Sequence, residues 1–118
     1  MFTLTRKDAG DITVVSVTGK LIGGSDNSVI FHDMFKTAIE EGRRSFVVDL
    51  AGAEWANSQG IGMLIGAYTS TSNAEGNLVL ANTGERIQDI LDVTRLNLIF
   101  KSFDSEDEAT AFVSQQAG

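Results

Sequence analysis

Residues 45–67 read SFVVDLAGAEWANSQGIGMLIGA, and this stretch decides the fold class that the sequence predicts. Residues 46–50 form a short apolar run rich in β-branched side chains, which is typical of a central strand covered on both faces. Asp49 and the small residues Ala51 and Gly52 are expected to end this strand. The run therefore predicts a buried inner strand, after which the chain turns.

The same stretch continues as a helix that is expected to begin close to Ser58. Apolar residues recur along it at helical spacing, namely Ile61, Leu64, Ile65 and Tyr68. Ser58 falls where the N-cap of this helix is predicted, because serine is among the residues preferred at that position. A hydroxyl there is exposed and lies beside backbone N–H groups that have no partner within the helix. Ser58 is therefore the residue whose role has to be explained.

The rest of the chain alternates between strand and helix patterns, without a linker or an internal repeat. A hairpin is expected over residues 2–17, and further strands over 46–50, 77–81 and 98–100. Helices are expected over 25–41, 58–73 and 85–94, and after Ser105, which with Glu108 has the spacing of a capping box. The inward stripe of the first helix is predicted to be Ile30, Met34, Phe35, Ala38 and Ile39. This order predicts a single α/β domain, with a mixed, mostly parallel sheet of about four to five strands and about four helices.

The composition excludes several classes of protein. A chain of 118 residues with 42% hydrophobic and 21% charged residues is typical of one globular domain, large enough to bury a stable core without disulfides or a structural metal. Because the chain has no cysteine, a disulfide framework, an iron–sulfur cluster and a thiolate zinc site are ruled out. No stretch approaches the ~20 apolar residues of a membrane span, and the N-terminal segment turns polar too early for a secretory signal. A cytoplasmic protein without a membrane partner is expected.

The charge balance points to proteins as partners. The formal net charge is −7, from 16 acidic and 9 basic residues, and the basic residues are mostly scattered. Such a chain repels phosphate backbones, so nucleic-acid binding is not expected. A protein partner with a basic docking face fits this balance better.

Three chemical interpretations of the sequence are poorly supported. The segment around Ser58 has the strand–nucleophile–helix shape of a hydrolase elbow, but the only histidine, His32, belongs to an earlier helix. Glycines at 19, 23 and 24, or at 60 and 62, lack the spacing of a nucleotide-binding fingerprint. The carboxylates of residues 106–108 lie in the first turn of a helix, where the helix dipole stabilises them. Neither an enzyme, a cofactor nor a metal is expected.

A regulatory interpretation remains, with Ser58 as a phosphorylation site on a binding surface. Gly62 and Gly66 lie four residues apart and leave one flank of the helix bare, either for a partner or for tight packing on the sheet. Met63 lies off the apolar stripe, and is either an anchor for a partner or covered by a neighbouring element. Ser58 itself is either such a site or only a cap.

Six short segments resemble a known family. They are Val48-Asp49-Leu50, 57–62 (NSQGIG), Leu78-Val79-Leu80, 93–96 (VTRL), Phe100 and 104–109 (DSEDEA). In this order they resemble the STAS domains of bacterial anti-sigma factor antagonists, over nearly the whole chain, residues 2–115. Asn57 stands where the family usually has Asp, and residues 19–22 (GKLI) where it often has Gly-x-Leu-Asp.

The resemblance implies a binding module that is switched by phosphorylation. In the family, the serine at the position of Ser58 is phosphorylated by a partner serine kinase that doubles as the anti-sigma factor. A PP2C-type serine phosphatase is the second implied partner, and transcription is regulated through the sigma factor that is released. The implied partner-binding residues are Asn57, Ser58, Gln59, Gly60, Gly62 and Met63. The alternative left open is a non-catalytic STAS subunit of a larger assembly, either a signalling scaffold or a lipid-transport ABC complex.

Overall fold

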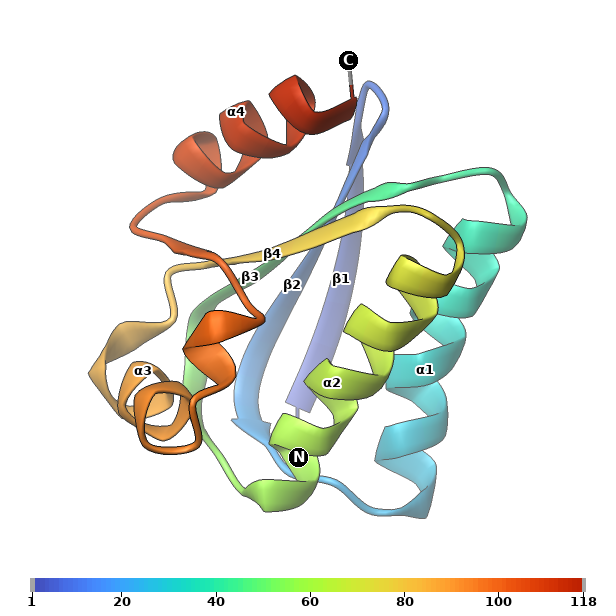
Figure 1. The fold of residues 1–118 in the computed structure, drawn as a ribbon. Coiled ribbons are helices and arrows are strands. Elements are labelled where there is room, and N and C mark those ends of the chain that lie inside the picture. Colours follow the sequence, from blue (N-terminus) through green and yellow to red (C-terminus); the bar gives the residue numbers. More distant parts are fainter. Residues whose placement is uncertain (1, 118) are drawn as a thin grey trace.

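A five-stranded sheet with helices on both faces forms the protein (Figure 1). The computed structural model describes residues 2–117. The elements are β1 (Phe2–Ala9), β2 (Ile12–Leu21), α1 (Ser25–Glu40), β3 (Ser45–Ala56), α2 (Ser58–Asn73), β4 (Asn77–Ala81), α3 (Gly84–Val93), the 3-10 turn η1 (Leu96–Leu98), β5 (Ser102–Phe103) and α4 (Glu106–Ala117). Strand order follows the sequence, with β1 antiparallel to β2 and every other pair parallel. The predicted mixed, mostly parallel α/β domain is confirmed.

Two hydrophobic cores lie on the two faces of the sheet. Alternate side chains of the inner strands point to opposite faces, so each continuous apolar run serves both cores. Val48 packs into the larger core, which is formed with α1, α2 and α3, whereas its neighbour Val47 packs into a smaller core. The smaller core is completed by Ala109 and Val113 of α4, which Figure 1 shows on the opposite side of the sheet from α1 and α2. The larger core therefore joins α1, α2 and α3 on one face of the sheet.

The strand predicted over residues 46–50 is longer than its sequence pattern. β3 continues past Ala51 and Gly52 to Ala56, because β2 provides a pairing partner along the whole length, up to Leu21 opposite Ala56. The register shifts twice along this pair, so the extra length is irregular rather than ideal. The prediction that Ala51 and Gly52 end the strand is wrong. The consequence is that β3 leads directly into α2, with only Asn57 between them.

The strand predicted over residues 98–100 is also wrong. Residues 96–98 form η1, after Arg95 adopts a left-handed conformation with φ of 64°, and the last strand lies at Ser102–Phe103. This turn leaves Leu98 81% exposed, while Phe100 is buried. The apolar residues of this segment therefore form a surface turn in which only Phe100 is anchored in the core.

The two long helices begin at the predicted positions, but one apolar stripe is shifted. α2 matches its predicted range, and α1 ends one residue early, before Gly42, whose φ is 97°. In α1, Phe31 is buried whereas Ile30 is 56% exposed, so the predicted inner position of Ile30 is wrong. One residue corresponds to about 100° around a helix, which is enough to move a side chain from the core to the surface. No helix within residues 2–117 has the length and apolar character required to span a membrane.

Candidate functional site

Asn57, not Ser58, caps the N-terminus of α2. The Asn57 side-chain oxygen accepts a hydrogen bond from the Gly60 backbone N–H at 2.8 Å and a longer one from Gly23 at 3.4 Å. Its backbone is extended, as an N-cap requires, so the predicted N-cap role of Ser58 is wrong. Asn57 also ties the loop after β2 to the start of α2. The cap at this site is therefore supplied without using the serine.

Ser58 is the first residue of α2 and is exposed. Within the described part of the chain its hydroxyl makes no hydrogen bond, and neither do the backbone N–H groups of Ser58 and Gln59. These N–H groups lie at the positive end of the helix dipole, where an anion is stabilised. The arrangement leaves an accessible nucleophilic hydroxyl beside N–H groups that can donate hydrogen bonds to a phosphate.

Gly60 and Gly62 serve different purposes although they are only two residues apart. A Cβ added at Gly60 would lie 1.9 Å from the carbonyl oxygen of Leu21, so this glycine allows α2 to pack directly on β2. A Cβ added at Gly62 or Gly66 would have no neighbour within 4 Å. Tight packing on the sheet is therefore found at Gly60, whereas at Gly62 and Gly66 it is wrong and the flank of the helix is bare.

An apolar groove lies between α2 and α3, with Ser58 at its wall. We call it the Ser58 groove; it has a volume of about 470 Å³ and is lined by Ala56, Asn57, Ser58, Ile61, Ile65, Ile90, Thr94 and Leu96. Five of these eight residues are aliphatic, and none carries a charge. A side chain that entered the groove would lose its contact with water next to the Ser58 hydroxyl.

A second groove, also of about 470 Å³, lies between α1 and α2. This α1–α2 groove is lined by Gly24, Ser28, Phe31, His32, Gln59, Gly62, Met63, Gly66 and Ala67. Met63 forms part of its floor and is only 8% exposed, so it is covered by its neighbours as a member of the main core. His32 lines the α1–α2 groove and Ser58 lines the other one, so these two residues do not share a groove.

The predicted partner-binding residues are thus divided between two surfaces. Asn57 and Ser58 line the Ser58 groove, whereas Gln59, Gly62 and Met63 line the α1–α2 groove. Gly60 is buried and lines neither of them. The aliphatic wall contributed by Ile90 and Leu96 was missed by the sequence prediction, because this wall exists only once α3 and η1 fold beside α2.

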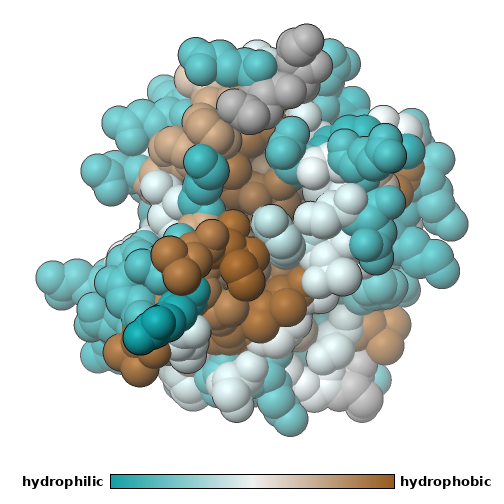
Figure 2. Space-filling view, viewed as in Figure 1, coloured by the Kyte–Doolittle hydropathy of each residue, from teal (hydrophilic) through white to brown (hydrophobic). Residues whose placement is uncertain are grey.

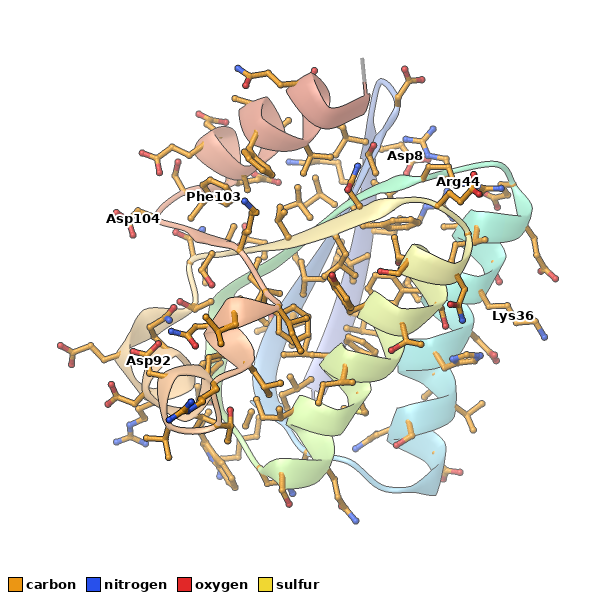
Figure 3. All side chains as sticks on the ribbon, viewed as in Figure 1. Asp8, Lys36, Arg44, Asp92, Phe103 and Asp104 are labelled. Atoms are coloured by element: carbon orange, nitrogen blue, oxygen red, sulfur yellow. The ribbon has the colours of Figure 1, made fainter. Side chains whose placement is uncertain are left out.

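The strong charge–charge contacts lie away from Ser58. Arg6 pairs with Asp8 and with Glu41, which lowers the pKa of Asp8 below its ordinary value and raises that of Arg6. Lys7 pairs with Glu106 at 2.9 Å, which raises the pKa of Lys7. Figure 3 shows Asp8 at the end of the molecule opposite to Asp92 of α3. These pairs clamp the hairpin to its neighbours and have no part in the candidate site.

Metal ligands are not gathered anywhere in the described residues 2–117, where no group of three His, Asp or Glu side chains is placed to hold an ion. Two of the three acidic residues at the start of α4 take part in structural contacts. Glu106 holds Lys7, and the Glu108 backbone N–H donates to the Ser105 hydroxyl at 3.1 Å, which is one half of the predicted capping box.

The comparisons with known proteins agree with this architecture. The STAS domain family model matches residues 4–109, and the chain therefore belongs to the STAS domain family. The resemblance predicted from the sequence is thereby confirmed. A search among curated proteins found no match.

Solved structures of low sequence identity share the fold. An anti-sigma factor antagonist from Mycobacterium paratuberculosis superposes with a TM-score of 0.82 at 20% identity, covering 97% of this chain and 95% of that one. The phosphorylated form of the Bacillus cell fate determinant SpoIIAA gives 0.71 at 18% identity, with 96% and 99% covered. A sulfate transporter family protein from Wolinella succinogenes gives 0.78 at 15% identity, with 91% and 88% covered. At these identities the likeness establishes the fold alone.

Proposed function

We propose that this protein is an anti-sigma factor antagonist, a non-catalytic cytoplasmic module whose binding is switched by phosphorylation at Ser58. In its unphosphorylated form it docks on an anti-sigma factor that is also a serine kinase, and so releases the sigma factor for transcription. A PP2C-type phosphatase restores the unmodified form. The observation that carries the proposal is the exposed Ser58 hydroxyl, without a hydrogen-bond partner in the described chain, at the wall of an apolar groove.

The switch follows from the surroundings of Ser58. A phosphate adds about −1.5 to −2 charges at pH 7 to a groove whose lining is uncharged. A partner that fills the groove would have to remove water from this dianion, and no arginine or lysine lines the groove to compensate. Phosphorylation therefore weakens docking. The backbone N–H groups at the start of α2 stabilise the same phosphate, so the fold is expected to persist.

Labelling and phosphopeptide mapping test the proposal. The purified chain is incubated with γ-labelled ATP and an extract of its native host, and the labelled peptide is sequenced. We expect the label on Ser58, lost in Ser58→Ala and kept in Ser72→Ala, a matched change at another exposed serine of α2. Label found only at other positions would contradict the switch, and stable co-purification with transporter subunits would favour the alternative of a subunit in a larger assembly.

A further inference from the structure

Four aliphatic side chains remain exposed around the turn that follows α3. Val93 is 83% exposed, Leu98 81%, Ile99 45% and Ile65 38%. We call this group the apolar patch. In Figure 2, hydrophobic residues gather in the region that η1 and the middle of α2 occupy in Figure 1, whereas the region of α3 is mostly hydrophilic. Exposed apolar clusters of this kind on a small domain are often sites of interaction.

The apolar patch is continuous with the Ser58 groove. Ile65 belongs to both, and Thr94 and Leu96 of the groove lie in the chain between Val93 and Leu98. Ile99 extends the surface toward Tyr68, with which it lines a neighbouring hollow. A molecule that occupied the groove would therefore meet the patch at its edge.

The local fold holds these side chains outward. Thr94 closes α3 by donating its hydroxyl to the Ile90 carbonyl at 2.7 Å, and Arg95 then turns the chain in a left-handed conformation. Phe100 anchors the end of the turn in the core, in edge-to-face contact with Tyr68. Leu98 lies between these fixed points, so its exposure is a property of an ordered turn.

The charge of the surroundings distinguishes between possible occupants. The chain carries a net charge of −7, and two copies or an anionic membrane surface would be repelled. Beside the patch, three exposed acidic residues, Glu85, Asp89 and Asp92, are matched by three exposed basic ones, Arg86, Arg95 and Lys101. The surroundings of the patch are therefore locally balanced in charge, and an apolar anchor of the partner that occupies the Ser58 groove fits them.

We propose that the apolar patch extends the docking surface of the Ser58 groove and binds the same protein partner, through an aliphatic or aromatic anchor. This inference rests on the proposed function, because the occupant is the partner that Ser58 controls. The groove provides the sensitivity to phosphate, and the patch provides contact area that the modification does not alter covalently.

Photo-crosslinking in the native host identifies the occupant. p-Benzoylphenylalanine is placed at position 98 in the patch, at position 94 in the wall of the Ser58 groove, or at position 36 as a control. Thr94 is exposed and lines the groove, and Lys36 is exposed on α1, on the side of the molecule away from α3 (Figure 3). We expect the same protein to be crosslinked from positions 94 and 98 and not from position 36. That protein, once purified, should bind Leu98→Ser at least tenfold more weakly than wild type, and Lys36→Ser within twofold, in the absence of ATP.

The outcomes separate the two proposals. Crosslinking from position 94 alone, an unchanged affinity of Leu98→Ser, or products of position 98 with lipid or with a second copy would overturn the inference and leave the Ser58 switch standing. Capture of one partner from both positions without any labelling of Ser58 would support the docking surface and contradict the switch. If neither position captures a protein, both proposals are wrong.

Discussion

Gly60 and Gly62 provide a matched pair for testing the packing of α2. In Gly60→Ala the new methyl carbon would lie 1.9 Å from the Leu21 carbonyl oxygen, whereas contacts of this kind are essentially never shorter than 3.0 Å. Helix or strand must therefore move by about 1 Å, and overpacking of this kind costs about 1–3 kcal/mol. We expect the upper end of that range, because the obstacle is backbone of a central strand and Leu21 is fully buried.

The same substitution at Gly62 is expected to raise the free energy of unfolding instead of lowering it. Its Cβ would meet nothing within 4 Å, and alanine is more favourable than glycine inside a helix by about 1 kcal/mol. The two variants should therefore differ by about 4 kcal/mol, or roughly 15 °C in Tm for a domain of this size. Urea unfolding and thermal melting followed by circular dichroism measure the difference. If Gly60→Ala were as stable as wild type, the described contact between α2 and β2 would be incorrect, and if Gly62→Ala were destabilised, the open space at Gly62 would be incorrect.

Three further expectations follow from the described contacts. Asn57→Ala should lower the free energy of unfolding by about 1 kcal/mol through loss of the cap, whereas Ser58→Ala should change it by less than about 0.5 kcal/mol in the same urea titration, and the reverse order would restore Ser58 as the cap. Met63→Glu places a carboxylate in the main core, and should destabilise the domain by several kcal/mol before any binding is lost; a melting temperature close to wild type would refute its burial. The hydrogen bond from Arg6 lowers the pKa of Asp8 in the folded state. The stability that the ionised Asp8 contributes is therefore present above its ordinary pKa of about 4 and is lost as the pH falls through the lower folded value. Asp8→Asn should be less stable than wild type at pH 7, and the difference in stability between the two should close in acid titrations.

Local patterns in the sequence predict some elements of the fold well. The bounds of α2 and β4 agree with the predicted ranges, because the apolar spacing and the polar or glycine stops lie within the elements themselves. The same holds for the capped start of α4, whereas the hairpin predicted over residues 2–17 extends to Leu21, because β2 continues along β3. The features that were predicted correctly depend on neighbours only a few residues away along the chain.

Features that depend on distant partners were not predictable from local patterns. The extension of β3 to Ala56 requires pairing with β2, whose pattern lies about 35 residues earlier in the chain. The side chains of residues 98–100 are of types typical of a strand, but the left-handed turn at Arg95 and the burial of Phe100 determine their conformation. These elements are decided by tertiary contacts that a single segment does not contain.

The candidate site was likewise predictable only in the part that depends on local sequence. Asn and Ser are both favourable N-caps, so the sequence placed the helix start within one residue but could not choose between Asn57 and Ser58. The Ser58 groove depends on α3 and η1 packing beside α2. Its aliphatic wall at Ile90 and Leu96 therefore has no signature near the serine itself.

The affinity of the partner kinase for two forms of this protein tests the account most directly. The unmodified chain and a chain fully phosphorylated at Ser58 are each titrated with the kinase by calorimetry without ATP, after circular dichroism has shown that both are folded. Docking through the Ser58 groove predicts that phosphorylation weakens binding at least a hundredfold, or about 2.7 kcal/mol, because a dianion would have to be dehydrated at an uncharged wall. Equal affinities of the two folded forms would contradict the account, since the partner would then dock without covering Ser58.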